Sequence, residues 1–283
     1  AVCQWEEPEG VNDVEEKETG QDPDFQSFVE NFKRLTGIDL SLYKEAQMKR
    51  RLTTFRNRKG FDTFAAYFEA VSKNKNMLVE LMDRMTINVS EFWRNPNRWE
   101  MLESRFLPEM LRTTPALNCW SAACATGEEP YSLAMILEEL GALKGSRILA
   151  TDIDENALAR AKIGKYEARS IKDVPQRYVD RYFRREGDHY VVSDVLKQSV
   201  IFRRGNLLTD PFESGFDLII CRNVMIYFTD DAKQLLYRKF SQALKKGGIL
   251  FVGSTEQIFN PGKYDLSPAD TFFYRKTPAD AGV

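Results

Sequence analysis

Apolar residues recur every three or four positions near the start of the chain. Phe25, Phe28 and Phe32 follow this spacing, and Gly37 ends the run, a pattern that predicts an amphipathic helix. The same periodicity predicts three more helices, over residues 42–59, 63–72 and 77–87. The sequence therefore predicts a small all-helical domain over residues 25–85.

The pattern changes in the rest of the chain, where short apolar runs alternate with helical periodicity. Strands are predicted over residues 117–123, 147–152, 200–208, 216–223 and 249–253, with a last strand at an edge of the sheet over 271–276. Helices are predicted over residues 97–114, 155–163, 175–183 and 230–245. This alternation predicts a Rossmann-like, doubly wound α/β fold with a mostly parallel sheet over residues 99–276. The sequence of residues 185–192 predicts a β-hairpin. This hairpin would belong to a short antiparallel insertion over about residues 185–200.

Three segments fall outside these two domains. Residues 1–24 hold nine Asp or Glu against one Lys and few large apolar residues, which predicts a disordered acidic arm. Residues 86–98 form a linker rich in polar side chains, and we expect it to contribute to the active site. Residues 277–283 are expected to be a short C-terminal tail.

Composition and charge narrow the function classes. The chain has 283 residues and a net charge of −2, with a pI near 5.8, which argues against a nucleic-acid partner because phosphate neutralisation needs a clustered basic surface. No apolar run approaches about 18 residues and no signal-peptide pattern is present, so we expect a cytoplasmic protein that does not insert into membranes. The four cysteines form no C-x-x-C pair, and no metal is expected.

The segment around Gly127 predicts a cofactor site. A buried strand, a turn of small residues and a helix start follow one another there, and Asp152 ends the next predicted strand, where a carboxylate can bind ribose hydroxyls. Only one of the three glycines of the dinucleotide fingerprint is present. Glu128 and Glu129 would repel a pyrophosphate but attract a cationic ligand, such as the sulfonium and ammonium of S-adenosylmethionine (SAM). One of the two carboxylates could instead stabilise the helix N-terminus.

Polar residues also follow two other predicted strands. Asn206 and Leu207 come after one of them, and Arg222 and Asn223 come at the end of another. Ligands of such sheets bind beyond the carboxyl ends of the strands, so these residues should converge on one crevice with Asp152.

Five sequence blocks together resemble the CheR-type chemotaxis receptor methyltransferases. The blocks are Asn88-Val-Ser-Glu-Phe-Trp-Arg94, Trp120-Ser-Ala-Ala-Cys-Ala-Thr-Gly-Glu-Glu-Pro-Tyr-Ser132, Ala150-Thr-Asp-Ile-Asp154, Asn206-Leu-Leu208 and Cys221-Arg-Asn-Val-Met-Ile-Tyr-Phe228. They occur in the family's order, and the resemblance covers about residues 25–276.

The resemblance implies an enzyme that transfers a methyl group from SAM to glutamate side chains of chemoreceptors. The products would be glutamyl methyl esters and S-adenosylhomocysteine (SAH). By this resemblance Glu129 would bind the ammonium of the cofactor and Asp152 its ribose. The other residues implied to line or close over the cofactor are Asn88, Ser90, Arg94, Asn206, Leu207, Arg222 and Asn223. Arg94 and Tyr227 would lie nearest the transferred methyl group and are the candidate catalytic residues.

This reaction fits the residues available in the chain. A glutamate carboxylate, with an ordinary pKa of about 4.3, is already ionised at neutral pH and needs no general base. A chain with a single histidine, His189, can therefore perform it. Arg94 could orient the carboxylate through charge-assisted hydrogen bonds, and Tyr227 could donate a hydrogen bond or shield the path of the methyl group. A linker ion pair for Arg94 and a core position for Tyr227 are the structural alternatives.

The predicted second helix is strongly basic and suggests a docking surface. Lys49, Arg50, Arg51 and Arg56 lie on it, and the resemblance implies that they bind acidic receptor helices in a salt-sensitive manner. A solvated charged face is the alternative. Some relatives bind a receptor's C-terminal pentapeptide through the antiparallel insertion. The insertion of this chain is short and poor in glycine, which argues against such tethering.

Two other function classes stay open at the level of sequence. A methyltransferase acting on nucleic acid or on a small molecule would share the fold, although the pI and the lack of an Asn-Pro-Pro-Tyr motif argue against it. A signalling or docking module that binds the cofactor without turnover is the second. A NAD-dependent oxidoreductase is disfavoured because the glycine fingerprint is missing.

Overall fold

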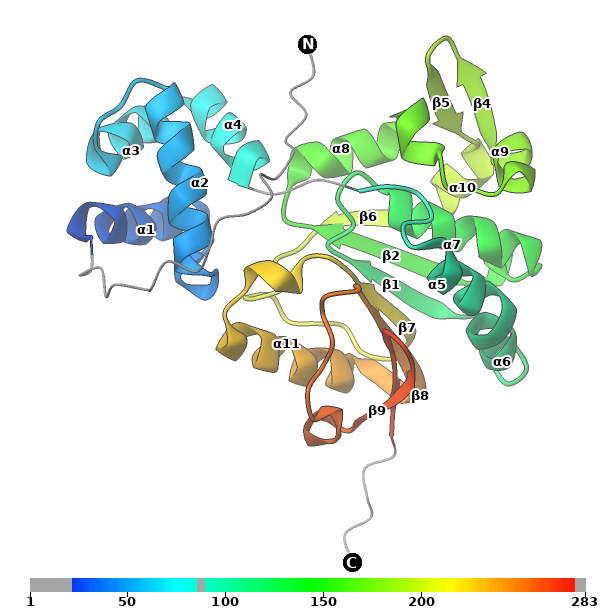
Figure 1. The fold of residues 1–283 in the computed structure, drawn as a ribbon. Coiled ribbons are helices and arrows are strands. Elements are labelled where there is room, and N and C mark those ends of the chain that lie inside the picture. The colour runs from blue at the N-terminus through cyan, green and yellow to red at the C-terminus, as the bar shows by residue number, and fades with distance from the viewer. Residues whose placement is uncertain (1–21, 86–89, 278–283) are drawn as a thin grey trace, which may run out of the picture.

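The computed structural model describes residues 22–85 and 90–277, which form a helical domain beside a larger sheet domain (Figure 1). Asn88 and nearly all of the predicted acidic arm lie outside the described residues. Within the described part of the chain, no helix has the length and apolar character needed to span a bilayer.

The N-terminal domain is built from four helices around an aromatic core. These are α1 (Pro23–Thr36), α2 (Glu45–Arg58), α3 (Phe64–Lys73) and α4 (Lys75–Met85), with a 3₁₀ turn, η1 (Leu40–Leu42), after α1. Asp22 caps α1 by accepting hydrogen bonds from the backbone N–H groups of Asp24 and Phe25. Gly37 ends the helix at φ 76°, as predicted. Phe28 and Phe32, which set the predicted period, are fully buried in this core.

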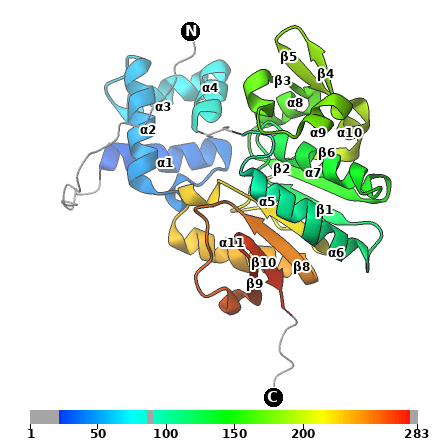
Figure 2. The ribbon, with the colours of Figure 1, turned by 45° about the vertical axis from the view of Figure 1, so that its right-hand side comes forward.

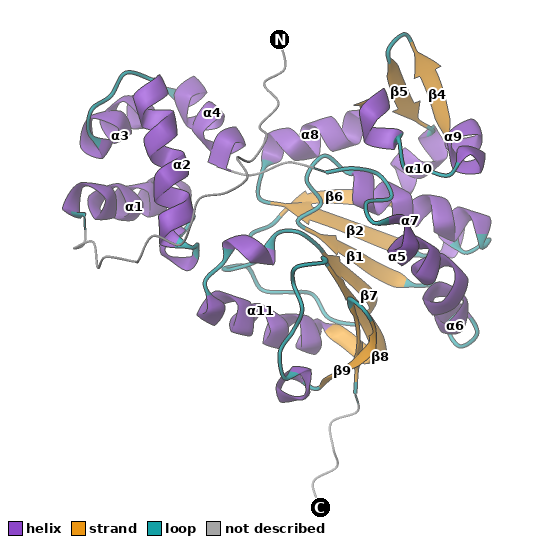
Figure 3. Cartoon of the chain, in the orientation of Figure 1, coloured by secondary structure: helices purple, strands orange, loops and turns teal. Residues whose placement is uncertain are grey.

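The larger domain has a seven-stranded sheet between two layers of helices (Figures 1 and 3). The strands are β1 (Asn118–Ala122), β2 (Arg147–Asp152), β6 (Val200–Arg204), β7 (Phe216–Cys221), β8 (Leu244–Val252), β9 (Leu266–Asp270) and β10 (Phe273–Lys276). Their order is β6-β2-β1-β7-β8-β10-β9, and the first five are parallel. The mostly parallel α/β fold predicted from the sequence is confirmed.

Helices cover both faces of this sheet because its central strands are apolar on both sides. On β7, Leu218 and Ile220 enter one core, while Ile219 and Cys221 enter the other. The helical elements of the larger domain are α5 (Pro96–Met101), a π-helical turn η2 (Leu102–Phe106), α6 (Leu107–Leu111), α7 (Glu128–Glu139), α8 (Glu155–Ile163), α11 (Asp230–Ala243) and the 3₁₀ turns η3 (Leu143–Gly145), η5 (Met225–Tyr227) and η6 (Pro261–Tyr264). Figure 2 shows α5 and α6 lying across the sheet from α11.

The edge of the sheet differs from the prediction. Residues 271–276 were predicted to form the edge strand, but β10 pairs with β8 on one side and with β9 on the other, so β9 is the edge. The strand β9 carries Pro268, which lacks a backbone N–H and masks the strand signal in the sequence. An edge strand tolerates proline because one of its sides needs no partner.

A small antiparallel sheet projects from the larger domain. It consists of β3 (Lys165–Glu167), β4 (Phe183–Glu186) and β5 (His189–Val192) in the order β3-β5-β4. The helical segments around it are η4 (Ala168–Ile171), α9 (Gln176–Tyr182) and α10 (Asp194–Ser199). The β4–β5 hairpin agrees with the predicted one. The third strand was not predicted, because three residues are too few to show a period of two.

The helical domain contacts the larger domain where the parallel strands end. The backbone N–H of Lys44 donates to the carbonyl of Tyr227 at 2.9 Å, and that of Thr229 donates to the carbonyl of Leu42 at 3.0 Å. The rings of Tyr43 and Phe228 meet edge to face, with centroids 5.1 Å apart. This contact brings the helical domain next to the crevice where ligands of such sheets bind.

Candidate active site

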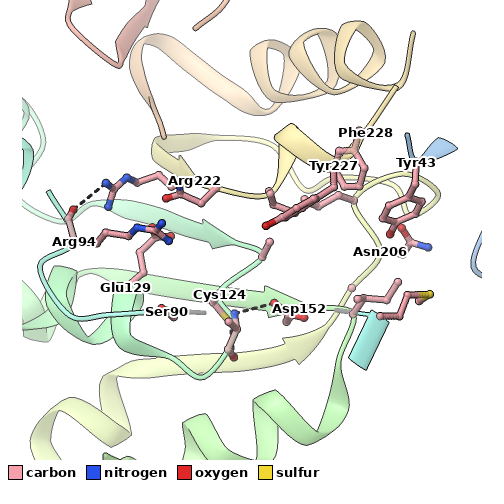
Figure 4. Close-up of a pocket in the computed structure, with 18 of the residues that line it drawn as sticks. Tyr43, Ser90, Arg94, Cys124, Glu129, Asp152, Asn206, Arg222, Tyr227 and Phe228 are labelled. Carbon is pink, nitrogen blue, oxygen red and sulfur yellow. Dashed lines mark hydrogen bonds between the residues drawn. The ribbon is translucent and has the colours of Figure 1, made fainter. Parts of the chain in front are cut away.

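A pocket lies at the carboxyl ends of β1, β2 and β7 and is lined by residues of both domains and of the linker (Figure 4). Of the site residues predicted from the sequence, Ser90, Arg94, Glu129, Asp152, Asn206, Leu207, Arg222, Asn223 and Tyr227 line this pocket. Asn88 lies outside the described residues. The convergence expected from the ends of separate strands is therefore present.

The turn after β1 has an unusual backbone that brings main-chain groups to the pocket. Ala123 and Ala125 have positive φ angles of 61° and 46°, a conformation that costs free energy for residues other than glycine. Gly127 has φ 93°, and a Cβ atom there would lie 2.8 Å from the Cβ of Ala161 in α8. Glycine is thus required both by the backbone and by the close approach of a helix.

Asp152 joins this turn to the end of β2. Its Oδ2 accepts a hydrogen bond from the backbone N–H of Ala125 at 2.8 Å, and its Oδ1 accepts one from Asp154 at 2.9 Å. The side chain is buried, and burial raises the pKa of its carboxyl above the ordinary value. It lines the pocket from the position that ribose-binding carboxylates occupy in doubly wound sheets.

The two adjacent glutamates at the start of α7 point to different surroundings. Glu128 is buried outside the main pocket, and the hydroxyl of Thr126 donates to its carboxylate oxygens at 2.8 and 2.7 Å. Glu129 lines the pocket and accepts a hydrogen bond from the Ser121 hydroxyl at 2.8 Å. Of these two glutamates, only Glu129 is therefore available to a ligand in this pocket. Glu129 and Asp152 together fit a ligand that carries both a positive charge and hydroxyl groups.

Arg222 links the end of β7 to the linker. Its Nη2 donates to the carbonyl of Arg94 at 2.9 Å and to Oδ1 of Asn95 at 2.7 Å. The guanidinium is buried and stacks on Phe251, with its carbon 4.6 Å from the ring centroid. These contacts of Arg222 hold the linker, and the charge of Arg222 lowers the pKa of Glu129, which burial raises more strongly.

The two candidate catalytic residues enter the pocket from different segments. Arg94 comes from the linker and Tyr227 from η5 (Figure 4). The guanidinium of Arg51 in α2 lies 5.7 Å from the centroid of the Tyr227 ring, and its Nη1 donates to the carbonyl of Met85 at 2.9 Å. Burial raises the pKa of the Tyr227 phenol, so this hydroxyl stays protonated and can donate a hydrogen bond.

The predicted docking residues on α2 lie in different environments. Arg50 is exposed. Lys49 forms an ion pair with Asp22 at 2.9 Å, and Arg56 stacks over Phe64 with its guanidinium carbon 4.6 Å from the ring centroid. Arg51 lines the pocket beside Tyr227, as described above. The four cations therefore do not share one solvent-exposed face.

Several pocket residues were not predicted from the sequence. Tyr43, Lys44, Gln47, Met48 and Met85 line it from the helical domain. No local pattern marks them, because their position depends on how the two domains pack. Glu256 was not predicted either: its position shortly after the carboxyl end of β8 marks it as close to the site, but not which groups it binds.

Comparison with known proteins supports this description. The family model for the CheR methyltransferase SAM-binding domain matches residues 88–273, and the model for the CheR methyltransferase all-alpha domain matches residues 23–86. A chemotaxis protein methyltransferase of Listeria monocytogenes is 46% identical over 90% of this chain and 97% of its own length. Those of Borreliella burgdorferi and Pseudomonas aeruginosa are 34% and 33% identical, over 78% and 86% of this chain and 83% and 93% of their own lengths.

A SAM-binding α/β domain with a pocket at the ends of its parallel strands defines a SAM-dependent methyltransferase. The chain belongs to the CheR methyltransferase family, because the two family models together match both of its domains. The resemblance inferred from the five sequence blocks is confirmed, and the names of the relatives connect the family with chemotaxis.

Proposed function

We propose that this chain methylates glutamate side chains in the cytoplasmic helical domain of methyl-accepting chemoreceptors, with SAM as methyl donor and SAH as the second product. The observation that carries the proposal is one pocket that holds two acidic residues suited to SAM beside an arginine and a tyrosine. The proposal includes a cytoplasmic enzyme that uses no metal and does not bind the receptor's C-terminal pentapeptide. No candidate metal cluster occurs in the part of the chain that the structure describes.

The chain's own residues would position the reactants. SAM supplies an electrophilic methyl group, so the protein needs to bind and orient the donor and the carboxylate rather than move a proton. Glu129 would bind the ammonium of SAM and Asp152 its ribose hydroxyls. Arg94 would orient the receptor carboxylate, and the phenol of Tyr227 would donate a hydrogen bond near the reacting atoms. The helical domain would exclude water from the pocket, which raises the reactivity of the carboxylate.

The test is transfer of labelled methyl groups from SAM to membranes that contain chemoreceptors, followed by mild alkali. Methyl esters release volatile methanol under these conditions, whereas N-methyl groups stay bound. Alkali-labile label on the receptor band would support the proposal. Binding of SAH without label on any receptor would contradict it, and label in nucleic acid would favour a different substrate class.

The affinity for SAH should fall as the pH is lowered from about 8 to about 6. Burial raises the pKa of Glu129 to about 7, and an ammonium ligand is attracted by the ionised carboxylate but not by the neutral acid. Protonation of Glu129 therefore removes the attraction. Calorimetric titrations across this range test the prediction, with Glu129→Gln as the control that should bind weakly and with a flatter profile. A flat profile for the wild-type protein would show that Glu129 does not interact with the ligand.

Substitutions of the neighbouring cations Arg50 and Arg51 should affect different kinetic constants. Arg50 is exposed, so Arg50→Gln should raise the KM for receptors by about two- to fivefold and weaken its salt dependence, with kcat unchanged. Arg51→Gln should lower kcat, because it removes the cation beside Tyr227. Initial rates against receptor concentration at low and high salt separate the two effects. Equal changes in KM with no change in kcat would mean that both residues only dock the receptor.

A further inference from the structure

Glu256 is a buried carboxylate that accepts hydrogen bonds from backbone N–H groups. It is 4% exposed. Its Oε1 accepts from the N–H groups of Val224 and Met225 at 2.8 and 2.7 Å. Its Oε2 accepts from Asn223 at 2.7 Å and from Gly253 at 2.8 Å. One side chain thus uses both oxygens to bind four N–H groups from two segments about thirty residues apart in the sequence.

The segment that Glu256 holds carries two of the proposed functional residues. Asn223 lines the pocket with φ 60°, a left-handed conformation that is unfavourable for residues other than glycine. The N–H groups of residues 223, 224 and 225 converge on the carboxylate, which offsets the cost of this conformation. Tyr227 follows two residues later, at the end of η5.

The contact leaves no space for a side chain at Gly253. A Cβ atom on Gly253 would lie 2.5 Å from Oε2 of Glu256 and 2.9 Å from the backbone nitrogen of Asn223. Glycine at this position therefore lets the two segments approach each other closely enough to share the carboxylate.

We propose that Glu256 is a positioning residue for methyl transfer: it fixes the backbone of residues 223–225 so that Asn223 and Tyr227 face the cofactor and the receptor carboxylate. The inference rests on the proposed function, since it assigns Glu256 a purpose within that site. Glu256 does not itself line the pocket.

The charge of Glu256 also acts on the pocket. Burial is the main cause that raises the pKa of Glu129 and of Tyr227, and the negative charge of Glu256 adds to both shifts. Glu256 therefore favours the protonated phenol of Tyr227. The nearby guanidinium of Arg222 provides the balancing positive charge.

The substitution Glu256→Gln tests the inference because it keeps the shape of the side chain. A carboxylate only accepts hydrogen bonds, whereas the amide NH₂ of glutamine is a donor. The glutamine NH₂ would face two backbone N–H groups, and donors cannot hydrogen-bond to each other. The backbone of residues 223–225 must therefore shift. We expect SAH to bind about tenfold more weakly and kcat on receptor membranes to fall about 100-fold. The KM for receptors should stay unchanged, because the proposed docking cations lie on α2.

The matched control is Asp217→Asn at the opposite end of β7. Asp217 is also buried, and it accepts hydrogen bonds from the backbone N–H of Asn118 at 2.8 Å and from Lys245 at 2.8 and 2.9 Å. Its substitution should lower the unfolding temperature while leaving SAH affinity and kcat as in the wild type. All rates are measured well below the unfolding temperature of each variant.

The outcomes distinguish a positioning role of Glu256 from a role in stabilising the fold alone. If Glu256→Gln matches Asp217→Asn in SAH affinity and kcat, Glu256 only stabilises the fold and the inference is overturned. If Glu256→Gln does not fold, Glu256→Asp replaces it as the test. This variant retains the charge and should fold, with a smaller loss of kcat than that expected for Glu256→Gln. A wild-type kcat in Glu256→Asp, whose side chain is shorter, overturns the inference. If the wild-type protein binds SAH but methylates no receptor, the proposed function fails, and the SAH affinities of the variants still test the role of Glu256.

Discussion

The Arg94→Ala variant should methylate receptors at least about 100-fold more slowly than the wild type while binding SAH almost as well. Arg222 can still hold the linker in this variant, because it donates to the backbone carbonyl of residue 94 and to the side chain of Asn95. Truncation removes the Arg94 guanidinium from the pocket and keeps these two contacts of Arg222. The lost function would be the orientation of the receptor carboxylate.

Single-turnover rates and SAH calorimetry on the same protein measure this prediction, and Arg98→Ala is the control. Arg98 is the last residue of the predicted linker, but it forms an ion pair with Asp270 at 3.7 Å and lies over Phe272, 5.0 Å from the ring centroid. Its loss should leave kcat unchanged. If a folded Arg94→Ala variant no longer binds SAH, Arg94 belongs to cofactor binding. If its kcat is normal, Arg94 has no catalytic role.

The parts of the site that follow local rules were predictable from the sequence. Gly127 indicates a tight turn because glycine adopts positive φ angles at less cost than other residues, and Asp152 ends an apolar run of strand length. Since parallel strands end at one edge of a sheet, the convergence of Asp152 and Asn223 followed from the strand assignments alone. The helical domain was predictable for a similar reason, since Phe28 and Phe32 are spaced by a helical turn.

The parts that depend on distant contacts were not predictable. Arg51 looks like one charge among several on a basic helix, and only the packing of the two domains brings it over the ring of Tyr227. Gly253 is the local hydrogen-bond donor to Glu256, and the other donors lie about thirty residues earlier in the sequence. They reach Glu256 because β7 and β8 pair side by side, which the sequence does not reveal. The strand β9 was missed because Pro268 weakens its pattern, and its edge position makes this proline acceptable. The domain boundaries and the individual roles of the site residues stay predictions.

The Asp152→Asn variant should lose cofactor binding, with the dissociation constant of SAH raised by about 100-fold or more. The two carboxylate oxygens of Asp152 each accept a backbone hydrogen bond, one from the turn after β1 and one from the loop after β2. An asparagine can keep only one of these bonds, because its NH₂ group would face the other N–H. The same replacement removes the charge proposed to bind the ribose hydroxyls. Both the shape of the turn and the ligand contact would therefore be impaired.

The neighbouring substitution Asp154→Asn separates the loss of binding from a general effect of removing a buried acid. Asp154 caps α8 by accepting hydrogen bonds from the N–H groups of Asn156 and Ala157 at 2.9 and 3.1 Å, and asparagine is a comparably good cap. That variant should bind SAH like the wild type, as calorimetry and thermal shifts with added SAH can measure. Equal losses in both variants would mean that the loop after β2 needs its acids for folding. Normal SAH binding by Asp152→Asn would mean that Asp152 does not contribute to the cofactor site, because the charge of its carboxylate would then be dispensable.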